Sequence, residues 1–272
     1  MNRAQRKILA EETLIILQNG FYTIEDNKVD FGYEQIEAKQ KSIYYESEQL
    51  DKILADSKAN ATHETVFKVT DETSLGAILR LHNEGNVMCL NFASAKNPGG
   101  GFLNGSLAQE ESLAAASSLY LCQKENFGFY EKHRKLKTNL YTDDIIFSPK
   151  VPFFRNDKGE LLEHPVLASV VTAAAVNYGA VEKNEKRKVA TIPEIMRRRI
   201  EKVLAISALH GNDTLILGAW GCGVFRNDPA VIAGLFKEVL ETKFKNQFKK
   251  VVFAIYANND RYIAPFRQEF ES

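Results

Sequence analysis

Segments with the pattern of buried strands alternate with segments of helical periodicity from residue 63 to the end of the chain. Short apolar runs between turn residues are typical of buried strands, whereas apolar residues three or four positions apart are typical of helices. The alternation predicts an α/β fold with helices on both faces of a mixed, mainly parallel sheet, and such folds bind ligands beyond the carboxyl ends of strands. The predicted strands are 66–69, 87–92, 145–147, 151–154, 166–171, 214–217 and 251–256. The predicted helices are 71–83, 110–123, 191–209, 228–244 and 262–270.

Residues 1–62 lack this alternation and are predicted to be a partly helical N-terminal extension of a domain that spans 63–272. Apolar residues at helical spacing predict a helix over 3–19, and a glycine follows where helices commonly end. The rest of the segment is polar and weakly periodic, with a short strand pattern at 21–23 and an amphipathic stretch near 44–54. These patterns indicate no role for the extension.

The charge balance excludes a global attraction for nucleic acids or membranes. The chain has 35 Lys and Arg residues and 35 Asp and Glu residues, so a polyanionic ligand needs a local site. Cys89, Cys122 and Cys222 are odd in number and far apart, which favours reduced thiols over a disulfide framework, and no Cys/His cluster indicates zinc. No apolar stretch is long enough to span a bilayer. We therefore expect a cytoplasmic protein that holds no metal.

The first motif with chemical potential follows the predicted strand 87–92. It contains three consecutive glycines, Gly99, Gly100 and Gly101. A helix then begins with Gln109, Glu110 and Glu111. Glycines let main-chain N–H groups come close to an anionic or sugar ligand, and the helix dipole favours ionised carboxylates, whereas a bound phosphate nearby favours protonated ones. Taken singly, each element also suits a linker or an ordinary helix start, so the functional interpretation depends on their combination.

A second glycine-rich loop joins the predicted strand 214–217 to the helix that Asp228 and Pro229 open. Its sequence from residue 218 is GAWGCGVFRN. The glycines again allow close main-chain approach, and the following helix N-terminus offers N–H groups to an anion. The loop lacks the Gly-Lys-Ser/Thr ending of a Walker loop and the GxGxxG spacing of dinucleotide-binding loops. A tight strand-to-helix turn without a ligand is the alternative interpretation.

Together the two motifs resemble a known enzyme family. Three glycines, seven intervening residues and Gln-Glu-Glu match the signature of poly(ADP-ribose) glycohydrolases. The stretch LNFASAKNPGGGFLNGSLAQEESL, followed by Leu119 and Tyr120, resembles the microbial branch of that family. The resemblance implies a macrodomain-like, three-layer α/β/α domain. In macrodomains a GxGV-aromatic loop wraps a diphosphate, and the residues that fit this pattern are Gly221, Cys222, Gly223, Val224 and Phe225.

The resemblance also implies a reaction, the hydrolysis of ribose–ribose O-glycosidic bonds in poly(ADP-ribose) from chain ends, with release of ADP-ribose. Glu111 is the implied general acid, which protonates the departing ribose oxygen and, once ionised, activates water. Glu110 is implied to hold the leaving ribose and Phe225 to pack beside the ribose under attack. Asn97 is the implied partner of the distal ribose hydroxyls, with Asn91 as the alternative.

Both glycine loops and Gln109 complete the implied substrate site, and the scheme needs no metal or cofactor. Two other functions stay open at this point. One is hydrolysis of a single ADP-ribose from a protein or nucleic-acid adduct. The other is a module that binds ADP-ribose without cleaving it, against which the presence of both Glu110 and Glu111 argues.

Three further patterns are less specific. Trp220, Phe253 and Tyr256 suit adenine stacking, but an apolar strand also supplies core aromatics, so we predict core positions. The run 197–199, Arg-Arg-Arg, predicts a solvated helix face, with attraction for a polyanionic chain as the alternative. Where the microbial family tends to have Ala-Ala-Pro-Asn, residues 174–177 are Ala-Ala-Val-Asn, a difference that we expect to affect a loop near the site and not the catalytic signature.

Overall fold

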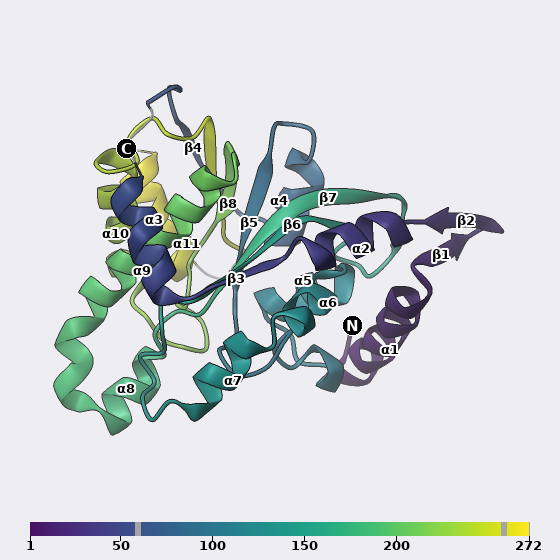
Figure 1. The fold of residues 1–272 in the computed structure, drawn as a ribbon, viewed down its shortest axis with the longest axis horizontal. Coiled ribbons are helices and arrows are strands. Elements are labelled where there is room, and N and C mark those ends of the chain that lie inside the picture. The colour runs from purple at the N-terminus through teal and green to yellow at the C-terminus, as the bar shows by residue number, and fades with distance from the viewer. Residues whose placement is uncertain (58–60, 257–259, 272) are drawn as a thin grey trace.

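A seven-stranded sheet forms the centre of the computed structural model, which describes residues 1–57, 61–256 and 260–271 (Figure 1). Its strands are β3 (Ile43–Tyr45), β4 (Val66–Thr70), β5 (Val87–Phe92), β6 (Ile145–Arg155), β7 (Leu161–Ala173), β8 (Thr214–Leu217) and β9 (Lys250–Ala254). They lie in the order β3-β6-β7-β5-β8-β9-β4. The pairs β3-β6 and β6-β7 are antiparallel, and the four pairs from β7 to β4 are parallel, which confirms the predicted mixed, mainly parallel sheet.

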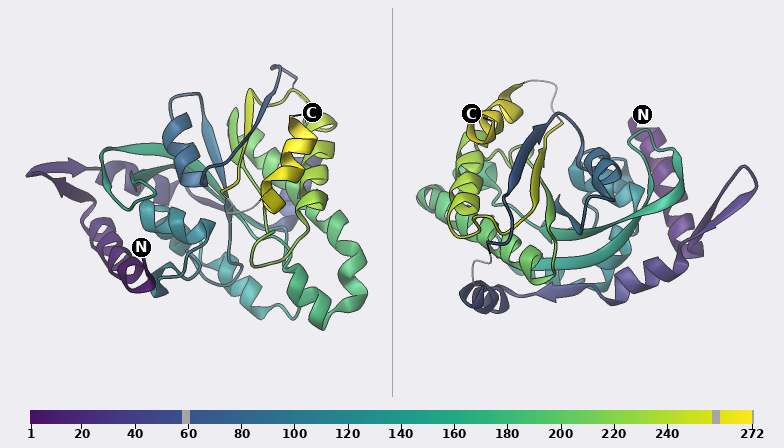
Figure 2. Two further views of the ribbon diagram at one scale, coloured as in Figure 1. Left: turned by 180° about the vertical axis from the view of Figure 1, so that it is seen from behind. Right: turned by 90° about the horizontal axis from the view of Figure 1, so that it is seen from above.

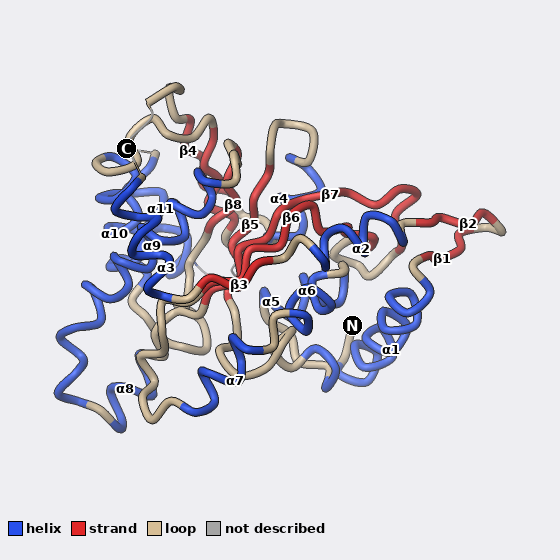
Figure 3. The backbone as a smooth tube through the Cα atoms, in the orientation of Figure 1, coloured by secondary structure: helices blue, strands red, loops and turns tan. Residues whose placement is uncertain are grey.

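Helices cover both faces of the sheet, as Figure 2 and Figure 3 show. One layer contains α3 (Ser47–Asp56), α9 (Ile192–Leu209), α10 (Pro229–Glu241) and α11 (Asp260–Phe270). The other contains α2 (Gly32–Gln40), α4 (Ser74–Leu81), α5 (Gln109–Ala116) and α6 (Leu119–Glu125). Side chains alternate along a strand, so Met88 and Leu90 of β5 join the core on one face while Val87 and Cys89 join the core on the other. The expected three-layer architecture is confirmed.

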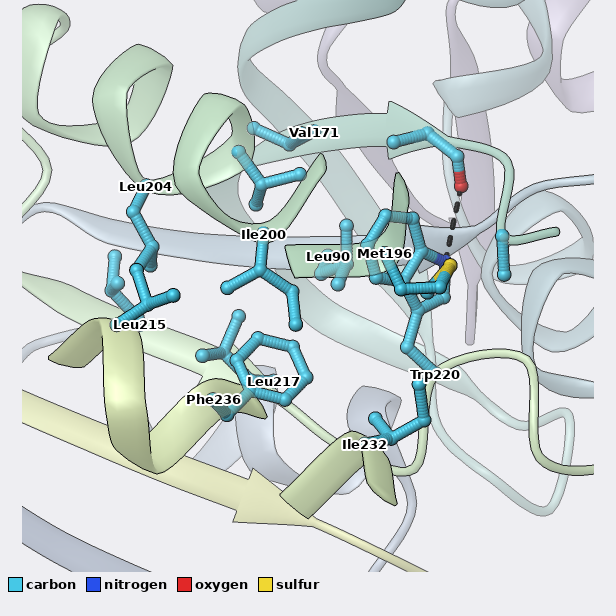
Figure 4. Close-up of a cluster of buried hydrophobic side chains, with 14 of the residues drawn as sticks. Leu90, Val171, Met196, Ile200, Leu204, Leu215, Leu217, Trp220, Ile232 and Phe236 are labelled. Carbon is cyan, nitrogen blue, oxygen red and sulfur yellow. Dashed lines mark hydrogen bonds between the residues drawn. The ribbon is translucent and has the colours of Figure 1, made fainter. Parts of the chain in front are cut away.

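The larger core fixes the base of the second glycine loop. Met196, Ile200 and Leu204 stand four residues apart on α9 and present one apolar face to the sheet (Figure 4). Trp220, fully buried, packs among them, and its indole N–H donates to the carbonyl of Ala173 at 3.3 Å. The predicted core position of Trp220 is therefore confirmed, and the loop that follows it begins from a rigid support.

Two predicted elements have a different shape in the structure. The helix expected over 110–123 is two helices, α5 and α6, because Ser117 is extended (φ −153°, ψ 177°) and forms a β-bridge with Phe153 of β6. The strands expected at 145–147 and 151–154 are the single strand β6, with a register shift between Ser148 and Val151. Among the described residues the prediction also missed α2, α7 (Gly128–Lys135), α8 (Tyr178–Asn184) and the 3₁₀-helices η1 (Phe102–Asn104) and η2 (Lys186–Thr191).

The N-terminal segment begins with α1 (Arg3–Asn19), which confirms the first predicted helix, and continues into a hairpin of β1 (Phe21–Ile24) and β2 (Asn27–Asp30). The amphipathic stretch predicted near 44–54 is divided between β3, which pairs with β6, and α3, which packs on α9. The division after residue 62 stays a prediction, although these contacts cross it. None of the described helices has the length and apolar character needed to cross a bilayer.

The solvated face predicted for 197–199 is wrong for one of its three arginines. Arg199 is 2% exposed, and its Nε donates to the Asp143 carboxylate at 2.9 Å. Arg198 and Lys202 also donate to Asp143, at 2.6 and 3.0 Å. Burial alone raises the pKa of Asp143, but these three cations outweigh it and hold that pKa well below its usual range. The acidic partner lies far away in the sequence, so the helix pattern alone gave no sign of the buried charge cluster.

Candidate active site

A cavity of about 1390 Å³ opens beyond the carboxyl ends of β5, β8 and β9, where an α/β fold is expected to bind its ligand. Ten of the twelve predicted site residues line it. They are Asn97, Gly100, Gly101, Gln109, Glu110, Glu111, Gly221, Gly223, Val224 and Phe225. The topology thus brings together two motifs that are more than 100 residues apart in the sequence.

Glu110 lies at the base of the cavity and is only 3% exposed. Its Oε2 accepts a hydrogen bond from the Ser94 N–H at 2.6 Å. Its Oε1 accepts from the side-chain amides of Asn91 and Gln123, at 3.1 and 2.9 Å. Burial raises the pKa of Glu110 to about 8, although all three donors oppose the shift. Glu110 is therefore a fixed group that the protein surrounds with donors.

Glu111 is half-buried in the cavity wall, and its Oε1 accepts a hydrogen bond from the Gly101 N–H at 2.8 Å. A Cβ atom on Gly100 would lie 2.4 Å from Glu111 Oε1 and 3.1 Å from Glu110 Oε2. Gly100 also has a φ of +59°, in the left-handed region that glycine adopts readily. Only a residue without a side chain fits here, and both carboxyl groups border the same point of the backbone.

The N–H groups of the first glycine loop are used within the protein. Gly99 donates to Gln123 Oε1 at 2.8 Å, Gly100 to the Asn97 carbonyl at 3.0 Å and Gly101 to Glu111. The expectation that these N–H groups approach an anionic ligand is therefore wrong for this arrangement. Buried N–H groups need acceptors, and protein groups supply them here. The resulting hydrogen bonds fix the loop and the Glu111 carboxylate.

The second glycine loop is open. Within the described part of the chain, the N–H groups of Gly223, Val224 and Phe225 donate no hydrogen bond. A Cβ atom on Gly223 would meet nothing within 4 Å, and Val224 is 84% exposed. Three consecutive unpaired N–H groups beside a cavity form a site for an anion such as a phosphate.

Comparisons with known proteins agree with this geometry. Residues 10–156, more than half of the chain, match the model of the microbial-type PARG catalytic domain, where PARG denotes poly(ADP-ribose) glycohydrolase. This protein belongs to the microbial-type PARG family. No curated protein matches the sequence.

Solved structures of this family are similar over nearly the whole chain. The poly(ADP-ribose) glycohydrolase of Thermomonospora curvata has 40% identity and a TM-score of 0.94, over 98% of this chain and 100% of that chain. The same enzyme bound to the inhibitor ADP-HPD has 40% identity and a TM-score of 0.92, with the same coverage. The Deinococcus radiodurans enzyme in complex with ADP-ribose has 39% identity and a TM-score of 0.84, over 87% of this chain and 97% of that chain.

The two candidate asparagines differ in position within this PARG fold. Asn97 is exposed in the cavity lining, and its Oδ1 accepts from Arg134 at 3.3 Å. Asn91 is fully buried and donates to Glu110 and to Thr172 Oγ1, the latter at 3.2 Å. Asn97 can therefore meet a ligand in the cavity, whereas Asn91 contributes to the support of Glu110.

Two other predicted contacts are less direct than expected. Gln109 lines the cavity, but its amide binds the main chain of β5 at both sides, accepting from the Phe92 N–H at 2.8 Å and donating to the Leu90 carbonyl at 2.7 Å. Cys222 is buried in the main core and absent from the lining, and burial raises the pKa of its thiol to about 12. Its side chain is thus part of the packing beneath the loop. Gly99, the other predicted residue outside the lining, is buried against the Phe102 ring.

The sequence prediction missed several residues of this PARG site. Gln123 lies on α6 beyond the unforeseen break at Ser117, so no helical spacing pointed it toward Glu110. Tyr256, predicted to be in the core, is 70% exposed at the cavity, whereas its predicted companion Phe253 is fully buried as expected. The signal that Tyr256 offered was its position just after the last strand, where ligand-binding residues of such sheets lie.

Residues 174–179 support the second loop from behind. Asn227 donates to the carbonyls of Val176 and Gly221, at 2.8 and 3.0 Å, and Gly179 donates to the carbonyl of Phe225 at 3.1 Å. Val176 stands where the PARG family tends to have proline, and its N–H contacts the Met196 sulfur at 3.4 Å. Proline has no N–H, so the departure from the family pattern adds this contact near the site.

Proposed function

We propose that this PARG family member hydrolyses the ribose–ribose O-glycosidic bonds of poly(ADP-ribose) and removes single ADP-ribose units from chain ends. The observation that carries the proposal is the position of Glu111, half-buried in the cavity wall and oriented by the Gly101 N–H at 2.8 Å. The similar enzymes from Thermomonospora curvata and Deinococcus radiodurans are poly(ADP-ribose) glycohydrolases, and the latter is known in complex with ADP-ribose.

Glu111 is proposed to move both protons of the reaction. It protonates the ribose oxygen that leaves, which generates an oxocarbenium-like centre on the distal ribose, and the resulting carboxylate then takes a proton from the attacking water. Glycosidases usually divide these tasks between two carboxyl groups. Glu110 is poorly placed to share them, because it is 3% exposed and already accepts three N–H hydrogen bonds. We assign Glu110 to holding the leaving ribose.

The second glycine loop is proposed to bind the diphosphate. The unpaired N–H groups of Gly223, Val224 and Phe225 supply donors that need no rearrangement, which favours electrostatic stabilisation of the reacting ribose nearby. Phe225 packs against Tyr141, with ring centroids 6.0 Å apart, and is thereby held beside the cavity to flank that ribose. Asn97 is proposed to bind the distal ribose hydroxyls.

The test is turnover of labelled poly(ADP-ribose) with product identification. Single ADP-ribose units are the expected product, and longer fragments would contradict cleavage from chain ends. Glu111→Gln is expected to lower kcat by at least about 1000-fold while ADP-ribose still binds, because the amide neither gives nor takes the proton. Glu48→Gln, an exposed change on α3, is the matched control. Retained hydrolysis by Glu111→Gln would exclude the assignment.

We also propose a cytoplasmic location. Cys89, Cys122 and Cys222 are free and buried in the core, and burial raises the pKa of each thiol. Such thiols suit a reducing compartment. Fractionation of the native cells tests this location.

A further inference from the structure

The wall of the cavity that α6 and α7 form carries its positive charge. Among the described lining residues, Lys124 near the end of α6 and Arg134 near the end of α7 are the only Lys or Arg side chains. Both are exposed, and neither pairs with a carboxylate in the described ranges. Two unpaired cations beside a cavity attract an anionic ligand.

An exposed aromatic ring accompanies these cations. The Arg134 guanidinium carbon lies 5.0 Å from the ring centroid of Phe127, which is 36% exposed and lines the same wall. Lys124 Nζ lies 5.7 Å from the ring centroid of Tyr120. Proteins that bind nucleotides without regard to sequence combine two features: cations that contact the phosphates, and aromatic rings on which the bases stack.

Apart from Glu110 and Glu111, the acidic side chains of the lining lie in another part of the cavity. Asp71, Glu72 and Asp157 line it near the start of α4, and Glu72 is paired with Arg80. A polyanion whose terminal unit lies in the cavity is therefore repelled from the α4 side and attracted toward the α6–α7 side.

The cationic wall also borders the reacting groups. Gln123, directly before Lys124, is hydrogen-bonded to both Gly99 and Glu110. Arg134 donates to the carbonyl of Lys96 at 2.7 Å and to Asn97 Oδ1 at 3.3 Å. The cavity of about 1390 Å³ exceeds the roughly 300–1000 Å³ typical of a site for one small ligand, so room remains beside a bound ADP-ribose.

We propose that Lys124, Phe127 and Arg134 bind the ADP-ribose unit on the leaving-group side of the scissile bond. The two cations meet the diphosphate of that unit, and Phe127 stacks on its adenine. The proposal rests on the proposed function, and it makes this wall the determinant that favours polymer over a substrate with a single ADP-ribose.

The test compares two substrates of the full-length protein. One is poly(ADP-ribose), and the other is an ADP-ribosyl conjugate of a neutral phenol, which has no leaving-group diphosphate. Lys124→Ala, which leaves the Arg134 contact with Asn97 in place, is expected to raise KM for the polymer roughly threefold. It is also expected to reduce the slope of log KM against log salt by about 0.7, the value of one phosphate contact. KM for the phenol conjugate and the Kd of ADP-ribose should stay within about twofold of the wild-type values.

Matched variants separate the wall from other effects. Lys245→Ala removes the same charge from an exposed position between α10 and β9 and should leave KM for the polymer unchanged. Phe127→Ala should raise that KM, and Phe127→Tyr, which keeps the ring, should restore it. Equal losses on both substrates, or none on either, would overturn the proposal. A wild-type protein that cleaves the conjugate but not the polymer would instead overturn the proposed function.

Discussion

The two glycine loops of this protein have the same sequence character and opposite hydrogen-bonding states. In the first loop, Gly99, Gly100 and Gly101 donate their N–H groups to protein acceptors, one of which is the Glu111 carboxylate. In the second, the N–H groups from 223 to 225 have no acceptor in the described parts of the chain, and these residues line the cavity. A glycine-rich loop after a strand therefore does not by itself identify a phosphate site. One loop orients Glu111, the proposed catalytic group, and the other has N–H groups free to bind an anion.

Among changes to the two loops, Gly100→Ala is expected to have the largest effect, because it acts where the first loop meets both glutamates. The added methyl group would lie 2.4 Å from Glu111 Oε1, and the backbone has a φ of +59°. Displacing a catalytic group by about 1 Å costs on the order of 100-fold in rate. We expect kcat on poly(ADP-ribose) to fall by 100-fold to 1000-fold. Gly234→Ala, where nothing lies within 4 Å of the added Cβ atom, is the control. If kcat of Gly100→Ala stays within about threefold of the wild-type value, the first loop tolerates a side chain.

The closed surroundings of the first loop also predict a pH effect on stability. Burial raises the pKa of Glu110 from 4.5 to about 8, so between these values the folded protein keeps a proton that the unfolded chain releases. The stabilisation is complete below about pH 4.5 and is lost as the pH rises through 8, by roughly 5 kcal/mol, at about 1.4 kcal/mol for each pH unit between the two pKa values.

Glu110→Gln isolates this contribution. His133 and His210 have lowered pKa values and act with the opposite sign, so the difference between the two proteins is the quantity to measure. The free energy of unfolding, determined by urea denaturation from pH 5 to pH 8, should decrease more steeply with pH in the wild-type protein than in Glu110→Gln. Parallel curves would mean that the Glu110 pKa is not raised.

Two glycines of the second loop should respond differently to the same change. A Cβ atom on Gly221 would lie 2.5 Å from Ala175 Cβ and 2.6 Å from Asn227 Nδ2, at a φ of +74°. Gly221→Ala should lower the free energy of unfolding by roughly 1–2 kcal/mol and weaken ADP-ribose binding by about tenfold. Gly223→Ala has open space and should change the free energy of unfolding by little. Calorimetric titration with ADP-ribose and thermal unfolding measure the two effects, and a reversed order would contradict the described loop packing.

The parts of the site that the sequence predicted are those that local pattern determines. Apolar runs and glycines located the two strand–loop–helix units in the sequence. The parallel arrangement of their strands brings the two loops together. The hydrogen-bond state of the first loop was not fully predictable, because the acceptor of the Gly99 N–H is Gln123, beyond the break at Ser117. The buried pairing of Arg199 with Asp143 was missed for the same reason, since its partner lies on another element. The N-terminal helix likewise gave no functional pattern, yet it contacts the first loop.

The contact between α1 and the first glycine loop predicts the smallest effect. It also distinguishes the two loops, since α1 supports only the first. Arg6 Nε donates to the Gly105 carbonyl at 2.9 Å, and Arg3 Nε donates to the Asn104 carbonyl at 3.0 Å, on the loop that follows Gly101. These hydrogen bonds hold the chain that positions the Gly101 N–H and, through it, Glu111. Arg6→Ala should therefore lower kcat on poly(ADP-ribose) by roughly threefold, the value of one partly exposed hydrogen bond, with KM unchanged. Glu11→Ala, at an exposed position of the same helix, controls for loss of helix stability. A rise in KM at constant kcat would show instead that α1 contacts the substrate and does not act through Glu111.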